Sequence, residues 1–249
     1  MRSLTADDII RFWEAGPRQD SAERAVAMLA AAFPDRSRED LLHLSLGQRN
    51  ARLLDVRQRF FGPEIQGFAE CQSCCERLEF TLSSDDIRDG GPVENSNAEF
   101  DLEAEGYVLR FRLLDTHDLR AVAAAVDVDV DVDAARKLLV ERCLLQVRRG
   151  DEMMAIVELP ERVIKQLAAR LAECDPQADV LIDLACPACE FRWQIPFDIA
   201  SFFYSEISIQ AQRLMREVHM LARAYAWHEA DILALSGRRR QYYLELLGQ

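Results

Sequence analysis

The chain has 249 residues and a formal net charge of −13, with 49% hydrophobic and 29% charged residues. These proportions are typical of globular proteins and exclude wholesale disorder or a fibrous repeat. The acidic balance argues against nucleic acid as the main partner. No apolar run approaches the roughly 18 residues that span a bilayer, so we expect no membrane contact. Acidic residues stand where a secretory signal needs basic and then apolar ones, which predicts a cytoplasmic protein.

The first sixty residues have helical patterns. Residues 5–8 form a capping box ahead of the first helix, and Ser21 is expected to cap a second helix over 22–33. A third helical pattern covers 40–60. These helices are predicted to end at Gly16-Pro17, Pro34 and Gly62-Pro63.

The periodicity changes after residue 65. Apolar residues alternate over 78–82, which predicts a strand with one buried face. Residues 100–102 and 107–113 flank Glu105-Gly106 and predict a β-hairpin. The glycine-rich stretch 90–97 predicts a loop between these strands.

Residues 126–133 alternate valine and aspartate between two helical patterns. They resemble a calcium-binding loop, but Val132 stands where such a loop needs glycine and Leu138 where it needs glutamate. An exposed loop is therefore the preferred interpretation. The wider window 84–133 holds 14 acidic residues and 4 arginines, and is either a solvated surface or a docking face for a basic partner.

The second half of the chain is predicted to be mainly helical. Thr116 is expected to cap a helix that begins near Asp118, and 180–185 predicts a short buried strand. The remaining predicted helices cover 133–148, 160–173, 199–207, 209–227, 229–235 and 238–247.

Two CxxC motifs repeat one local pattern. In both, the second cysteine is followed by apolar residues at positions +4, +6 and +8 and then by an Asp-Ile pair. This is typical of a zinc knuckle at the tip of a hairpin, and in a reducing compartment CxxC spacing favours metal over disulfides. The motifs are Cys71/Cys74 and Cys186/Cys189.

One knuckle supplies two ligands, whereas a structural zinc ion takes four. We therefore expect Cys71, Cys74, Cys186 and Cys189 to converge on about one structural zinc ion per chain, with the intervening residues folded as a separate lobe. Such a closed site leaves no position for a catalytic water. Unmetallated cysteine pairs, a redox dithiol and disulfides remain as alternatives.

The residue that follows each second cysteine departs from the usual knuckle pattern. Glycine is favoured there for its conformational freedom, but this chain has Cys75 and Glu190. Cys75 is either a substitute ligand or a bystander. Cys143 and Cys174 fall on predicted helices and are interpreted as core thiols.

No catalytic set is evident. GxSxG, P-loop, HExxH and GxGxxG motifs are absent, so we expect no enzymatic activity. A helix-turn-helix near 231–240 would suit a DNA-binding protein, but its arginines are better explained as caps on carbonyl groups or as a patch for an acidic protein. The histidines are scattered, with none at a telling distance from an acid or a cysteine: His43, His117, His219 and His228.

Three segments resemble the T-even-type phage baseplate hub assembly proteins, whose relatives occur in gene clusters for phage-tail-like contractile injection systems. They read RLLDVRQRFFGPEIQGFAECQSCCERLEF, DPQADVLIDLACPACEFRWQIPFDIASFF and LMREVHMLARAYAWHEADILALSGRRRQYYLELL. The resemblance implies a non-enzymatic assembly factor or minor component of the hub or baseplate, which stays in the cytoplasm or enters the assembled particle. Its implied partners are baseplate, hub or spike proteins, with no nucleic acid and no small-molecule substrate.

We predict an α+β protein with helical ends around a small zinc-ribbon-like β lobe and a helical insertion between the two knuckles. Two functions of other classes stay open, a zinc-ribbon regulator that binds nucleic acid and a metal- or thiol-dependent enzyme. The predicted regions are an N-terminal helical region 1–62, a first knuckle and hairpin 63–115, a helical insertion 116–175, a second knuckle 176–200 and a C-terminal helical region 201–249.

Overall fold

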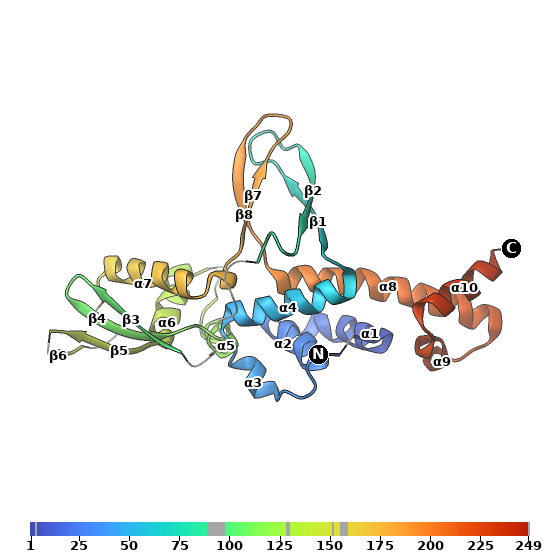
Figure 1. Cartoon of the computed structure of the whole chain (residues 1–249), viewed down its shortest axis with the longest axis horizontal. Helices are drawn as coiled ribbons and strands as arrows, with labels where there is room; N and C mark the ends of the chain where they lie inside the picture. Colours follow the sequence, from blue (N-terminus) through green and yellow to red (C-terminus); the bar gives the residue numbers. More distant parts are fainter. Residues whose placement is uncertain (3, 89–97, 128–129, 151, 155–158, 249) are drawn as a thin grey trace. The chain divides into compact units, whose positions relative to one another are not determined.

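A computed structural model describes residues 1–2, 4–88, 98–127, 130–150, 152–154 and 159–248. It forms two compact units, residues 1–34 with 200–249 and residues 35–199. Helices and small antiparallel sheets alternate along the chain, which confirms the predicted α+β class (Figure 1). In the described ranges, no helix combines the length and apolar character needed to cross a membrane. The predicted loop 90–97 lies outside these ranges, and the predicted region boundaries stay predictions.

The first unit is helical, and side-chain caps start its first two helices and its last one. The predicted capping box at Thr5 and Asp8 is present. The second helix is capped by Asp20, whose carboxylate accepts the N–H of Glu23 at 2.7 Å, so Ser21 is the first helical residue and not the cap. The helices of this unit are α1 (Ala6–Ala15), α2 (Ser21–Ala32), α8 (Ile199–Tyr225), α9 (Glu229–Ala234) and α10 (Gly237–Leu247).

Helix α8 is continuous where the sequence predicted two helices. The expected break falls at Ser208, but its hydroxyl donates to the carbonyl of Tyr204 at 2.8 Å and so stays within the helix. One apolar stripe then runs along the helix at the spacing of a buried face. Its buried members include Phe203, Ile207, Ala211, Leu214 and Leu221.

The C-terminal helices are fastened to α8 by a buried ion pair. The Arg240 guanidinium donates to Glu217 on α8 at 3.0 Å and to the carbonyl of Leu235 at 2.6 Å. This confirms, for Arg240, the interpretation of an arginine as a cap on a carbonyl group. Trp227 stacks on Tyr225 and belongs to a hydrophobic cluster that also contains Leu221 and Ile232.

In the second unit the helical pattern over 40–60 forms two helices, α3 (Arg38–Leu42) and α4 (Leu46–Phe61). The prediction of one uninterrupted pattern was wrong because Ser45 starts a new helix. Its hydroxyl accepts the N–H of Gln48, and the Gln48 side chain accepts the N–H of Ser45, both at 3.2 Å.

The predicted hairpin at Glu105-Gly106 is present as β3 (Glu99–Ala104) and β4 (Tyr107–Arg112). Both turn residues have positive φ, 50° and 81°, as a tight hairpin turn requires. The hairpin continues into an antiparallel sheet of order β3-β4-β5-β6 with β5 (Leu144–Arg149) and β6 (Glu152–Met153). This sheet is separate from the cysteine hairpins.

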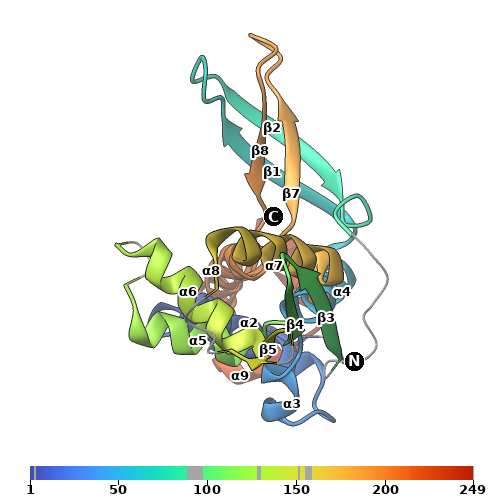
Figure 2. The same ribbon diagram turned by 90° about the vertical axis from the view of Figure 1, so that its left-hand side faces the viewer.

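The predicted helix 133–148 was wrong in its second half. Helix α6 (Val132–Cys143) ends at Cys143, and the next residues form β5, in which Val147 pairs with Leu109 of β4. The helix that precedes α6 is α5 (Thr116–Ala125), and it is capped by Asp115, not by Thr116. Helix α7 (Glu161–Cys174) and α6 share one core with β4 and β5 (Figures 1 and 2).

Candidate metal centre

The two CxxC motifs lie at the tips of two antiparallel hairpins. The first joins β1 (Glu64–Glu70) to β2 (Arg77–Ser83), and the second joins β7 (Leu181–Ala185) to β8 (Arg192–Pro196). Both views show the hairpins side by side with their tips at the same end (Figures 1 and 2). Each hairpin is the one predicted from the alternating apolar residues around its motif.

A buried polar network joins the chain segments from which the two hairpins leave. Helix α4 precedes β1, and the short 3₁₀ helix η3 (Pro176–Ala178) precedes β7. The carboxylate of Asp175 accepts the N–H of Gly47 at 2.9 Å and the hydroxyl of Ser45 at 3.1 Å. Burial raises the pKa of Asp175, although these two hydrogen bonds lower it in part.

The same network extends to the end of the first hairpin. The Asn50 side chain donates to the carbonyl of Gln177 at 3.1 Å, and the Gln177 side chain donates to the carbonyl of Ile87, beyond β2, at 3.1 Å. Gly47 is required here because a Cβ at this position would collide with the carboxylate of Asp175. Motifs separated by 111 residues are therefore brought together by the protein frame itself.

The two knuckles have the same backbone geometry. In each, the N–H of the first cysteine donates to the carbonyl of the residue that lies two positions after the second cysteine. The carbonyl of the first cysteine accepts the N–H of the residue directly after the second cysteine. All four of these hydrogen bonds measure 2.9 Å. The pairs are Cys71 with Glu76 and Cys75, and Cys186 with Phe191 and Glu190.

The four sulfurs form a compact group, which we call the cysteine quartet: Cys71, Cys74, Cys186 and Cys189. The Sγ atoms of Cys71 and Cys189 are 3.6 Å apart, as are those of Cys74 and Cys186, and all four lie within 4.8 Å of one another. Bonds of about 2.3 Å to one tetrahedral zinc ion place sulfurs about 3.8 Å apart. The spacing fits a metal ion and is far too long for disulfide bonds.

The electrostatics of the quartet favour a bound cation. Burial raises the pKa of Cys71, but the backbone N–H groups of Cys74 and Ser73 outweigh this and bring it down to about 7. For Cys74, the N–H of Glu76 lowers the pKa, whereas the sulfurs of Cys189 and Cys186 raise it to about 12. Because the sulfurs oppose one another's ionisation, full deprotonation of the quartet needs a compensating positive charge.

Among the described residues, only a small hydrophobic cluster otherwise holds the two hairpin tips together. The buried residues of this region are Cys71, Leu78, Cys186 and Trp193. A two-stranded hairpin is marginally stable alone, and so small a core adds little. A metal ion would supply the missing attachment between the tips.

The backbone beyond each second cysteine is left-handed, as the knuckle pattern implies, with φ of 60° at Cys75 and 58° at Glu190. A side chain in this conformation costs roughly 1 kcal/mol. We expect Cys75→Gly to stabilise the turn by about 0.5–1 kcal/mol, measured as slower amide hydrogen exchange over 71–76. Cys75→Ala removes the thiol but keeps the Cβ and is expected to give no gain. Equal gains in both variants would contradict the strain argument.

The structure separates the other cysteines from the quartet. Cys75 is exposed and outside the group of converging sulfurs, as expected for a bystander. Cys143 is fully buried, and burial raises its pKa to about 12, which confirms a core thiol. Cys174 is half-buried at the edge of the same core.

A second group of metal-ligating side chains was missed in the sequence. Donor atoms of Glu39, His43 and His117 lie within 4.8 Å of one another. The expectation that no histidine stands at a telling distance from an acid was wrong, because Glu39 on α3 and His43 at the C-terminal end of that helix are four residues apart and in contact. His117 could not be joined to them from spacing alone, since it is 74 residues further along the chain.

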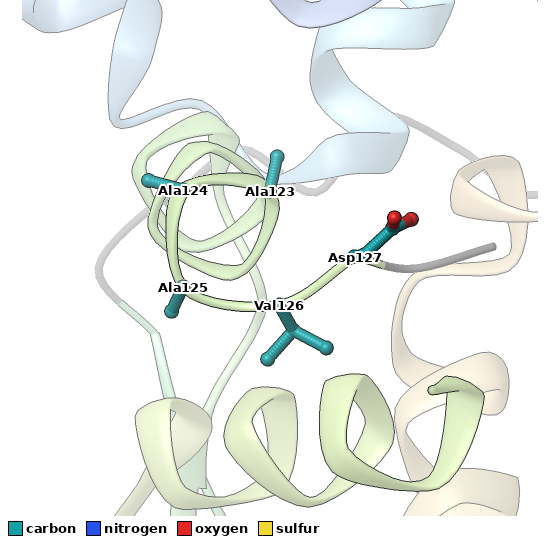
Figure 3. A pocket seen from close by; sticks show the side chains of 5 residues that line it. All are labelled: Ala123, Ala124, Ala125, Val126 and Asp127. Atoms are coloured by element: carbon teal, nitrogen blue, oxygen red, sulfur yellow. The ribbon is translucent and has the colours of Figure 1, made fainter. Parts of the chain in front are cut away.

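Two hollows of the second unit lie among the described residues. One, of about 440 Å³, lies at the end of α5 and is lined by residues 123–127. Its one ionisable side chain is Asp127, which points away from Val126 in Figure 3. Another, of about 490 Å³, lies between α6 and α7, where Arg136 is paired with Glu161 at 3.0 Å.

These observations define a mixed α+β protein with a four-cysteine centre at the tips of two hairpins. Over residues 12–204 the sequence matches the family described as T4 bacteriophage base plate protein, so the chain belongs to the T4-type phage baseplate protein family. The match confirms the resemblance stated above and ends before the third of the three segments, which begins at Leu214. Comparison with curated proteins and with solved structures gave no match.

Proposed function

We propose that the chain is a non-enzymatic assembly factor or minor component of the baseplate or hub of a contractile tail, either in a phage or in a phage-tail-like injection system. Membership of the baseplate family over 12–204 is the observation that carries this proposal. Its partners would be baseplate, hub or spike proteins of the same tail, bound through protein surfaces and without nucleic acid or a small-molecule substrate.

The surface of the paired hairpins supports a role in protein contacts. Phe68 on β1 is 78% exposed, and Leu181 on β7 is 49% exposed. Phe191, which precedes β8 and stacks on Trp193, is 40% exposed. Exposed aromatic residues of this kind are enriched where protein interfaces form.

The cysteine quartet would serve this function as a structural site. Four thiolates close the coordination shell of zinc and leave no position for a catalytic water, so the bound ion would hold the hairpins together. The Ser73 N–H, 3.5 Å from the sulfur of Cys71, is placed to stabilise a thiolate ligand.

The test is deletion of the gene in a bacterium that produces the particle. Sheath and tube proteins should still be made, while complete particles become rare, and a plasmid copy should restore them. Probing purified particles for the chain distinguishes a component from a factor that leaves. Normal particle numbers after deletion would refute the assembly role.

Two further assays address the other classes of function. A salt-sensitive shift of DNA by the purified protein would favour a nucleic-acid regulator over the proposal. Rapid iodoacetamide labelling of a cysteine other than the exposed Cys75 in the metal-loaded protein would indicate an activated thiol and favour an enzyme. We expect neither result.

A further inference from the structure

Glu39, His43 and His117 bring three metal-ligating side chains together away from the cysteine quartet. Oε1 of Glu39 is 3.3 Å from Nε2 of His43 and 3.2 Å from Nε2 of His117. The imidazole rings lie side by side with their centroids 4.6 Å apart. Glu39 and His43 come from α3 and its end, whereas His117 comes from the first turn of α5.

The fold fixes these groups through the backbone. The N–H of Leu46 donates to the carbonyl of Leu114 at 3.0 Å, and Ser45 and Asp115 form an isolated β-bridge. The chain just after His43 is therefore tied to the chain just before His117. Their meeting does not depend on flexible side chains alone.

Asp115 holds the ring of His43 in place. One carboxylate oxygen of Asp115 accepts the N–H of Asp118 at 3.1 Å, and the other lies 3.2 Å from Nδ1 of His43. A carboxylate that accepts the Nδ1–H of a histidine leaves Nε2 as the free lone pair, which is the usual support of a metal-bound imidazole. Asp115 is thus a positioning residue for His43.

With this tautomer, two electron-rich atoms face each other without a proton between them, because Nε2 of His43 lies 3.3 Å from an oxygen of Glu39. The Nε2 atom of His117 is buried and has no hydrogen-bond partner among the residues that the structure describes. A cation at the centre of the group would satisfy all three atoms.

We propose that Nε2 of His43, Nε2 of His117 and the carboxylate of Glu39 bind one divalent transition metal ion of the zinc class. Bonds of about 2.0 Å in a tetrahedral arrangement separate neighbouring donors by about 3.3 Å, which matches the two distances to Glu39. Two imidazoles and one carboxylate suit zinc, nickel or copper, not calcium. Because all three side chains are partly exposed, water completes the coordination, and this ion is held more weakly than one bound by four thiolates.

The test is titration of the full-length protein, already loaded with one equivalent of zinc, with further Zn²⁺ at pH 7.5. Calorimetry should detect a second equivalent, and NMR of the imidazole groups should show shifts at His43 and His117 but not at the exposed His219. His43→Gln should lower the affinity for the second zinc ion by at least about tenfold. Loss of an outer-shell partner already has an effect of this size, and His43 would contact the ion directly. His219→Gln is the matched control and should leave it unchanged.

Glu39→Gln provides an independent variant, since it removes the carboxylate charge at an exposed position and keeps the size of the side chain. It should also weaken the second equivalent, while circular dichroism and the tightly held zinc stay as in the parent. Absence of a second equivalent would overturn the proposal. Equal binding by His43→Gln and His219→Gln would do the same, because it would assign the ion to scattered surface groups.

Discussion

Replacing Cys74 by serine is expected to release the metal ion and to separate the two hairpins, whereas the same change at the neighbouring Cys75 leaves both in place. Cys74 contributes one of the four converging sulfurs, and Cys75 lies outside the group. Structural zinc binding is worth on the order of 10 kcal/mol in zinc-finger peptides. Loss of one ligand therefore removes most of the attachment between tips whose own core is very small.

The unfolding should stay local. The frame from which the hairpins leave is held by Asp175 and Gln177, not by the metal. Hydrogen exchange is therefore expected to accelerate strongly in β1, β2, β7 and β8 of Cys74→Ser, while α4 and β4 keep their protection. Elemental analysis should find about one tightly held zinc ion per chain in the parent and in Cys75→Ser, and a large deficit in Cys74→Ser.

A chelator provides a second way to remove the ion. A strong chelator added to the parent should reproduce the exchange pattern of Cys74→Ser, and added zinc should reverse it. If the parent binds no zinc, or if neither chelation nor Cys74→Ser changes exchange in the hairpins, the metal clamp is refuted. The unmetallated pairs considered from the sequence would then be the correct interpretation.

The cysteine centre was predictable because its chemistry is local. The spacing within each CxxC motif and the alternation that follows it determine a hairpin with two thiolates at its tip, and a four-ligand ion requires both motifs. The means by which the motifs meet was not predictable. It depends on Asp175 contacting Gly47 and Ser45, which are about 130 residues away in sequence.

Strand β5 shows why local periodicity fails elsewhere. Val140, Leu144 and Val147 are buried and follow the spacing i, i+4, i+7, which favours a continued helix. The chain nevertheless leaves the helix after Cys143, because pairing of β5 with β4 satisfies backbone groups along an otherwise open sheet edge. A tertiary contact of this kind overrides a weak local preference.

Asp118→Asn is expected to destabilise the second unit by about 2–4 kcal/mol at pH 7. This is less than the largest costs of breaking a buried ion pair, because the arginines that contact Asp118 are partly exposed to solvent. The Asp118 side chain is fully buried and accepts two hydrogen bonds from Arg112, at 2.7 and 2.9 Å, and one from Arg142 at 2.8 Å. Asparagine offers one acceptor and no charge to this pair of arginines, which join β4 and α6 to α5.

The effect should depend on pH in a defined direction. Burial raises the pKa of Asp118, but the hydrogen bonds and charge of Arg112 outweigh this and hold it below its ordinary value. The stabilisation is thus complete above the unfolded-state pKa of about 3.9 and is lost as the pH falls through the lower folded-state pKa. The difference in unfolding free energy between parent and Asp118→Asn should be constant from about pH 5 to 8 and shrink below about pH 4.

The matched control is Asp101→Asn, which removes an equivalent charge from an exposed pair with Arg110 at 3.2 Å and should cost less than about 0.5 kcal/mol. Native-state hydrogen exchange in β4, α5 and α6 at increasing urea concentrations measures both variants in the part of the fold they affect. Equal stability of the two variants, or a loss in Asp118→Asn that does not diminish in acid, would mean that the two arginines do not depend on the charge of Asp118. Packing alone would then hold α5 and α6 to the sheet.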